Sequence, residues 1–181
     1  MTQEKQIFIR DVIPADRPDI NRINADGWEY AYRGIISDGL LDTMLEKIRN
    51  YTPRLAGKTS AENDYKIALV STNSAGKITG FAIGGLGRSQ TISETNDVWI
   101  LDALYVDPNV IGTGIGRKLF SEWARRAITA GAEKFIIRCA SANKSCGFYD
   151  KIGCKRIAET TDPNFENKPV TFFEFDLKDF K

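Results

Sequence analysis

The chain has 181 residues, of which 42% are hydrophobic, with 25 Lys and Arg against 24 Asp and Glu, three cysteines and no histidine. This length suits one domain with its own core, and we expect residues 1–181 to form a single domain. The net charge of +1 gives no reason to expect a nucleic-acid partner. Without histidine, the chain cannot build imidazole-ligated metal sites or triads with an imidazole base, and we predict no metal.

No stretch is apolar enough for a signal peptide or for a membrane span of about 18 residues or more. The cysteines, Cys139, Cys146 and Cys154, are odd in number and contain no Cys-x-x-Cys pair. This usage is typical of reduced thiols. We therefore expect a cytoplasmic protein without a membrane partner.

The first third of the chain predicts a strand followed by two helices. Apolar residues over 7–12 indicate the strand. The first helix follows Asp16, a residue type that caps helices, has Pro18 in its first turn and ends near Gly34. The second helix begins near 37–38 and carries an apolar stripe.

The middle third predicts a meander of strands. Alternating segments at 66–71 and 78–86 flank a turn signal at 73–77 and indicate a hairpin. The most apolar strand follows at 98–106 and stops at Asp107–Asn109.

The last third predicts alternating helices and strands. In order, the sequence indicates a glycine loop, a helix, a buried strand, a short helix and two closing strands, at 112–116, 119–128, 135–139, 148–152, 154–158 and 170–177. A strand, helix, strand crossover implies a parallel strand pair. We therefore predict an α+β fold with a mixed, mostly antiparallel sheet, one parallel strand pair and helices on both faces.

The glycine loop is the clearest candidate for a ligand site. Glycine occupies every second position from Gly112 to Gly116, which lets the backbone approach a ligand closely, and the next helix points its free amides at the loop. Arg117 adds positive charge in the first turn. The loop is neither a Walker loop nor the Gly-x-Gly-x-x-Gly loop of dinucleotide-binding folds. A tight turn without a ligand is the alternative.

Two segments resemble signatures of the GCN5-related N-acetyltransferase (GNAT) superfamily. Leu104–Leu119 is similar to the acetyl-CoA motif of that family. Asn143–Cys154, an Asn followed by Phe-Tyr-x-Lys-x-Gly, is similar to its second signature. Ala31–Ile36, after Trp28, resembles the first helices of many bacterial members. The resemblance covers nearly the whole chain, and the order of elements agrees with it.

The resemblance implies direct transfer of an acetyl group from acetyl-CoA, as co-substrate, to a primary amine of a small molecule, peptide or protein. Family members are often dimers, so a homodimer is possible. The residues that the resemblance assigns to the cofactor are Leu104, Tyr105, Val106, Ile111, Gly112, Thr113, Gly114, Ile115, Gly116, Arg117 and Asn143. Backbone groups of the first three face the cofactor in this reading, and Asn143 bonds its pantetheine arm.

Tyr149 matches the general acid of the family. A phenol with a pKa of about 10 stays protonated at neutral pH and can protonate a thiolate whose pKa is about 8.5. The alternative for Tyr149 is a tyrosine of the core. The general base stays open between Asp102, a water relay and an amine that arrives neutral. In a regular strand, Asp102 shares the face of Leu104.

The acceptor amine cannot be read from the sequence. Trp28, Tyr32 and Arg33 lie where, in the family, the first helices line the acceptor site. The alternative role is core packing for Trp28 and an exposed position on a solvated face for Arg33. The loops at 51–64, 88–96 and 162–169 shape that site and have no diagnostic composition.

One residue departs from the family pattern. The family usually has Gln or Arg at the position of Ile111. This departure supports the alternative function, a non-catalytic acyl-CoA-binding or regulatory module.

Overall fold

The computed structural model describes residues 6–50, 57–58, 65–88 and 97–180. Its α-helices and strands are, in chain order, β1 (Phe8–Asp11), α1 (Arg17–Tyr32), α2 (Asp38–Asn50), β2 (Gly57–Lys58), β3 (Tyr65–Thr72), β4 (Ile78–Arg88), β5 (Asp97–Val106), α3 (Ile115–Thr129), β6 (Lys134–Ala140), α4 (Cys146–Lys151), β7 (Lys155–Asp162) and β8 (Lys168–Asp176). Each predicted helix and strand is present, whereas the short β2 was not predicted. The loops at 51–64 and 88–96 lie outside the described residues, apart from 57–58 and 88.

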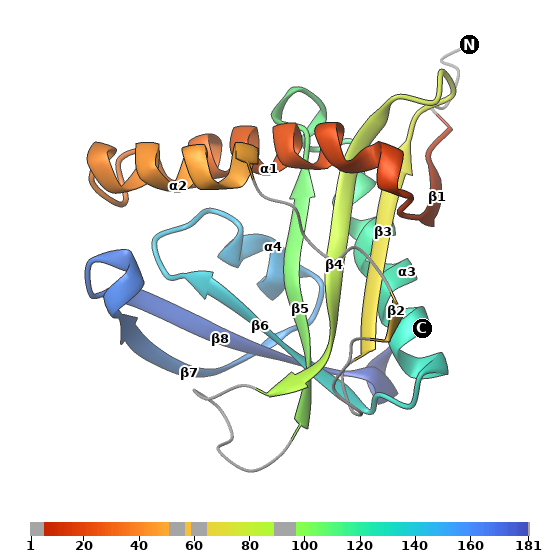
Figure 1. The fold of residues 1–181 in the computed structure, drawn as a ribbon. Coiled ribbons are helices and arrows are strands. Elements are labelled where there is room, and N and C mark those ends of the chain that lie inside the picture. Colours follow the sequence, from red (N-terminus) through yellow and green to blue (C-terminus); the bar gives the residue numbers. More distant parts are fainter. Residues whose placement is uncertain (1–5, 51–56, 59–64, 89–96, 181) are drawn as a thin grey trace.

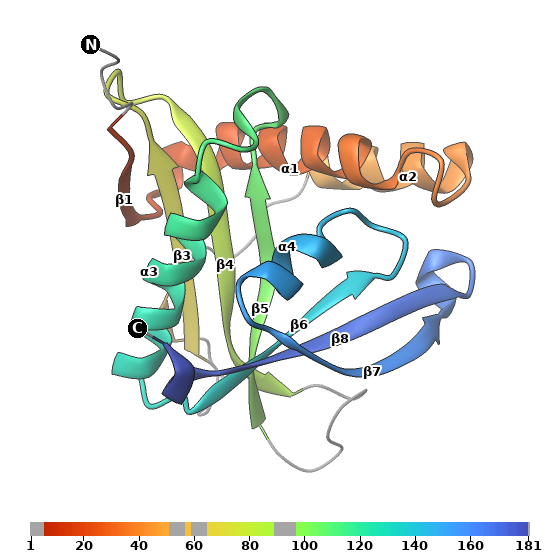
Figure 2. The same cartoon turned by 180° about the vertical axis from the view of Figure 1, so that it is seen from behind.

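The strands form one sheet in the order β1-β3-β4-β5-β6-β8-β7, with β2 beside β3. Among the strands that the structure describes, only β5 and β6 pair in parallel, and the other pairs are antiparallel. Helices α1 and α2 lie on one face of the sheet, and α3 and α4 lie on the other (Figures 1 and 2). The prediction of a mixed, mostly antiparallel sheet with helices on both faces is confirmed.

Apolar side chains are buried on both faces of the sheet. On one face, Leu119 and Trp123 of α3 pack over Leu69 of β3. On the other face, Ile23 of α1 packs over Phe81 of β4. Each of these side chains is at most 1% exposed, and burial of such a side chain contributes about 1.5–3 kcal/mol. The two cores hold the helices at fixed positions over the sheet.

The start of α1 differs from the sequence prediction in one detail. Asp16 directly precedes the helix, but its side chain does not cap it. The carboxylate instead accepts hydrogen bonds from Arg10 at 2.6 and 2.8 Å and from the amide of Ile13 at 2.8 Å. Asp16 therefore fixes the turn between β1 and α1 rather than the first turn of the helix.

The sheet opens between β5 and β6. The two strands pair only at Ile100 with Ile136 and at Leu101 with Ile137. Beyond these positions β5 continues to Val106 beside β4, while β6 follows β8, so the strands diverge. Figure 1 shows β6, β8 and β7 turning away from β5 as a group. Within the described part of the chain, one edge of β5 therefore has no strand partner after Leu101.

A β-bulge lies at the point where the strands separate. The register between β4 and β5 shifts by one residue at Asp102, which is left as the extra residue. Leu101 and Leu104 consequently both pack in the core on the α3 face. The expectation that Asp102 shares the face of Leu104 applied to a regular strand, and β5 is not regular at Asp102. Its carboxylate lies 3.2 Å from the amine of Lys66 on β3.

Two further sequence expectations concern thiols and membranes. Cys139, Cys146 and Cys154 are free thiols, and all three are buried. Among the helices that the structure describes, none combines the length and the apolar character needed to cross a bilayer.

Candidate active site

A cavity of about 560 Å³ lies between the diverging ends of β5 and β6. The predicted site residues that line it are Leu104, Tyr105, Val106, Ile111, Gly112, Gly114, Ile115, Gly116, Arg117, Asn143 and Tyr149. Thr113 is absent from this lining, and its hydroxyl donates to the carbonyl of Val110 at 2.7 Å. The strand end, the glycine loop and α4 thus converge on one space, although they are far apart in sequence.

The glycine loop borders open space at Gly112 and Gly114. Gly112 and Gly114 have φ angles of 87° and 85°, in the left-handed region that glycine tolerates. No atom lies within 4 Å of the position that a Cβ would take at either residue. The first helical bond runs from Lys118 to Gly114 at 3.1 Å, so the amides of 115–117 have no acceptor within the helix. Such amides attract an anion.

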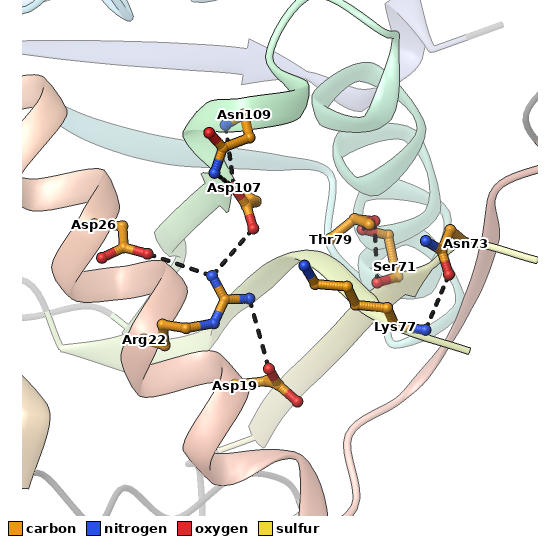
Figure 3. A network of polar contacts seen from close by, with 9 residues as sticks. All are labelled: Asp19, Arg22, Asp26, Ser71, Asn73, Lys77, Thr79, Asp107 and Asn109. Atoms are coloured by element: carbon orange, nitrogen blue, oxygen red, sulfur yellow. Dashed lines mark hydrogen bonds and ion pairs between the residues drawn. The ribbon is translucent and has the colours of Figure 1, made fainter. Parts of the chain in front are cut away.

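Asp107 fixes the start of this loop. Its carboxylate accepts hydrogen bonds from the backbone amide of Asn109 at 3.0 Å and from its side chain at 2.9 Å. It also lies 3.1 Å from Arg22 of α1, which in turn contacts Asp26 and Asp19 at 3.3 and 3.5 Å (Figure 3). Burial opposes ionisation, but these contacts outweigh it and hold the pKa of Asp107 below its usual range.

Tyr149 lies on α4 and is only 7% exposed. Its ring centroid is 5.4 Å from those of Phe148 and Phe173. Burial raises the pKa of Tyr149 well above the usual value of a phenol. The side chain is therefore a neutral O–H group at physiological pH, at the junction of the aromatic core and the cavity wall.

A group of side chains that the sequence did not predict lies beside the cavity. It comprises Tyr32 on α1, Tyr105 on β5 and Asn143 before α4, which all line that space. Burial is the largest effect on the pKa of Tyr32 and raises it to about 12. Burial likewise raises the pKa of Tyr105 well above its usual value. Asn143 accepts from the amide of Ser145 at 2.9 Å, which fixes its orientation.

Gly27 lets α1 approach this group closely. A Cβ at Gly27 would lie 2.5 Å from Cδ1 of Tyr105, closer than side chains pack. Both residues line the cavity. The sequence offers no signal for this contact, because Gly27 lies inside a helix and far from β5.

A second cleft, of about 1050 Å³, lies on the α1 and α2 side of the opening. Five residues line both spaces, namely Tyr32, Leu101, Asp102, Tyr105 and Arg138. Trp28 and Tyr32 line the second cleft, where the sequence had suggested an acceptor wall. Arg33 lines neither space and instead pairs with Glu29 and Asp38 at 2.7 and 2.6 Å.

Several solved structures share this fold. PaiA N-acetyltransferase from Thermoplasma acidophilum, solved with coenzyme A, is 18% identical over 94% of this chain and 99% of its own, with a TM-score of 0.69. YncA from Salmonella typhimurium, a putative acetyltransferase solved with acetyl-CoA, is 21% identical over 96% and 95%, with a TM-score of 0.63. A GCN5-related N-acetyltransferase from Rhodopseudomonas palustris, also described as an aminotransferase of class II, is 19% identical over 97% and 99%, with a TM-score of 0.71.

The comparison of sequences identifies the family. A search of curated proteins finds no match. A family model described as the acetyltransferase (GNAT) family matches residues 36–154, well over half of the chain. This range includes the glycine loop, β5, β6 and α4. The chain therefore belongs to the GNAT family of acetyltransferases.

Proposed function

We propose that the protein transfers an acetyl group from acetyl-CoA to a primary amine by direct attack of the amine on the thioester. The observation that carries this proposal is that three predicted features line the same cavity, at the opening between β5 and β6. The cavity is lined by the glycine loop, the unpaired edge of β5 and Tyr149 together. Family membership supports the same activity.

The chain's groups fit coenzyme A along the length of the cavity. The amides of 115–117 and the empty space over Gly112 and Gly114 suit the pyrophosphate. The free edge of β5 over 104–106 can pair with the pantetheine arm as an added strand does. Asn143 lines the cavity, and its side-chain amide carries two N–H donors that can bond the arm. Ile111 contributes no polar group, and we assign the phosphate contact to backbone amides and Arg117.

Acetyl-CoA supplies an activated acetyl group when bound. A backbone amide of 104–106, on the unpaired edge of β5, polarises the thioester carbonyl by donating to its oxygen. Tyr149 protonates the sulfur that leaves, because burial keeps the phenol neutral. Neither role needs a histidine.

The acceptor enters through the second cleft and meets the acetyl group where the two spaces join. Asp102 lies at this junction, paired with Lys66. Deprotonation of the amine therefore proceeds through Asp102, through water, or before binding.

Isothermal titration with acetyl-CoA tests the first half of the proposal. We expect saturable binding of acetyl-CoA and weaker binding of ATP, because no Mg²⁺-ligating Ser or Thr follows the glycines. No heat at high micromolar protein would refute the proposal. Binding of coenzyme A without transfer to any amine would instead favour the non-catalytic module.

A further inference from the structure

The second cleft combines an aromatic wall with one well-placed cation, and together they define a class of acceptor. This inference rests on the proposed function, because it takes that cleft as the entrance for the amine. The cleft joins the cofactor cavity at Tyr32, Tyr105 and Arg138. The chemistry of its walls therefore selects what is presented to the acetyl group.

The aromatic wall consists of Trp28, Tyr32 and Phe165. The ring of Trp28 lies 4.6 Å from that of Tyr32 and 5.7 Å from that of Phe165, which is 5.5 Å from Tyr32. Phe165 comes from the turn between β7 and β8. The adjacent Glu166 holds this turn to α2 by accepting from the amide of Ser37 at 3.0 Å. The wall is therefore held by α1 on one side and by the turn between β7 and β8 on the other, and its rings suit an apolar group.

Arg138 on β6 supplies the cation. Its guanidinium Cζ lies 6.0 Å from the centroid of Phe165, and Nη2 lies 3.0 Å from Oδ2 of Asp162. The other oxygen of Asp162 accepts from the backbone and side chain of Asn164 at 2.8 and 3.1 Å, so Asp162 is held in place. Within the described residues, Arg138 makes no aligned hydrogen bond, and its side chain is 46% exposed. The N–H groups of Arg138 that do not face Asp162 are therefore available to a ligand.

Two carboxylates are among the described residues that line the same cleft. Asp102 pairs with Lys66 at 3.2 Å, and Glu166 binds the amide of Ser37. Lys47, by contrast, has no ion-pair partner among the described residues. The cleft can therefore receive an anion at Arg138, whereas a polyamine or aminoglycoside would find, among the described lining residues, only Glu166 as a carboxylate without an ion-pair partner.

We propose that the acceptor is a free α-amino acid with an apolar side chain, whose carboxylate binds Arg138 and whose side chain packs on Trp28, Tyr32 and Phe165. The reaction forms a bond between the amine nitrogen and the acetyl carbon and breaks the bond between that carbon and sulfur. The amine loses a proton to water or Asp102, and the thiolate gains one from Tyr149. The products are an N-acetyl amino acid and free coenzyme A.

The lack of a strong base agrees with this class of acceptor. The α-amine of a free amino acid is more basic than one at a chain terminus, whose pKa is about 8, because the adjacent carboxylate stabilises the ammonium form, but it is less basic than the amine of lysine, whose pKa is about 10.4. Near neutral pH a larger fraction of an α-amine is therefore neutral before it binds. A base already paired with Lys66, as Asp102 is, suffices for such an acceptor.

The test compares L-phenylalanine with L-phenylalaninamide, which keeps the ring and the amine but lacks the anion. Spermidine is the third acceptor, and transfer is followed by thiol release from acetyl-CoA. Because the amine of the amide is less basic, kcat/KM is expressed per neutral amine for each acceptor. On this scale we expect the wild type to prefer phenylalanine by about 10-fold or more, which corresponds to one charge-assisted contact. Arg138→Gln should remove this preference and leave the KM for acetyl-CoA unchanged.

The chain offers a matched control in Arg156. This arginine also pairs with an aspartate, Asp150 at 2.8 Å, and lies over a phenylalanine ring, Phe173 at 5.3 Å. It lines neither space. Arg156→Gln should therefore keep the preference for phenylalanine.

Three results would overturn the inference. They are a wild type that prefers the amide or spermidine, an Arg138→Gln variant that keeps the preference, and a variant whose main change is a higher KM for acetyl-CoA. In each case transfer to some amine still occurs, and the proposed function stands. Bound acetyl-CoA without transfer to any amine would instead refute the proposed function itself.

Discussion

The guanidinium of Arg22 lies 3.1 Å from the carboxylate of Asp107, and this contact joins residues 85 positions apart in the chain. It links the middle of α1 to the end of β5, where the glycine loop begins (Figure 3). Because α1 also walls the second cleft, the contact supports both sides of the proposed reaction centre.

Replacement of Asp107 by Asn should destabilise the protein in a pH-dependent way. The folded-state pKa of Asp107 is held below the unfolded value of about 3.9. Its stabilisation is therefore complete above that value and is lost as the pH falls through the folded-state pKa. We expect a loss of about 1 kcal/mol at pH 7, or roughly 2–4 °C in Tm, that shrinks below about pH 4.

Asp26 provides the control for this prediction. It contacts the same Arg22, at 3.3 Å, but its side chain is 46% exposed. Asp26→Asn should change stability by less than about 0.5 kcal/mol. Thermal melts of both variants between pH 3 and pH 7 decide the matter, and equal losses in the two variants would contradict the role given to Asp107.

Gly114→Ala should weaken coenzyme A binding by about 10-fold or more. The φ of 85° disfavours any residue with a Cβ by about 1–2 kcal/mol, and the new methyl group would project into the space proposed for the pyrophosphate. Gly76→Ala, at φ 77° in the turn between β3 and β4, carries the same strain away from the cavity. Titration should show normal affinity in Gly76→Ala, and an unchanged affinity in Gly114→Ala would argue against the loop as the phosphate site.

Gly27→Ala should lower Tm by several degrees, although alanine favours helices. The added Cβ would lie 2.5 Å from Tyr105 and push that ring away from Tyr32, at a cost of about 1–3 kcal/mol. Gly39, in α2, has no atom within 4 Å of its Cβ position. Gly39→Ala should therefore melt at the wild-type temperature or above, and the same result for Gly27→Ala would refute the tight contact with Tyr105.

Tyr149→Phe should reduce kcat by about 100-fold or more while acetyl-CoA affinity stays near that of the wild type. Phenylalanine keeps the ring contacts with Phe148 and Phe173 and removes only the proton donor. Steady-state kinetics and titration on the same preparation separate the two effects. An unchanged kcat would leave Tyr149 as a core residue only.

The elements and their order could be predicted from the sequence because local signals mark them. Alternating glycines between an apolar strand and a helix indicated the cavity wall around Gly112 and Gly114, and both residues line it. The crossover from β5 through α3 to β6 required a parallel pair, which the structure contains. These features depend on neighbours in the chain.

The features that were missed depend on the angle between distant elements. The bulge at Asp102 has no local signal, because apolar residues flank it on both sides and fit either register. Tyr32, Tyr105 and Asn143 come together beside the cavity only because α1 crosses the open end of the sheet. Arg138 lies in a short strand for which the sequence indicates only that it is buried. Its position where the cavity and the second cleft join follows from the divergence of β6 from β5.

The most direct test of the proposed function measures thiol release from acetyl-CoA with the wild type and Tyr149→Phe, across a panel of amino acids, peptides, polyamines and aminoglycosides. Our proposal predicts amine-dependent release above hydrolysis with the wild type for at least one amine, and strongly reduced release with the variant. Binding of acetyl-CoA without release for any amine would contradict it.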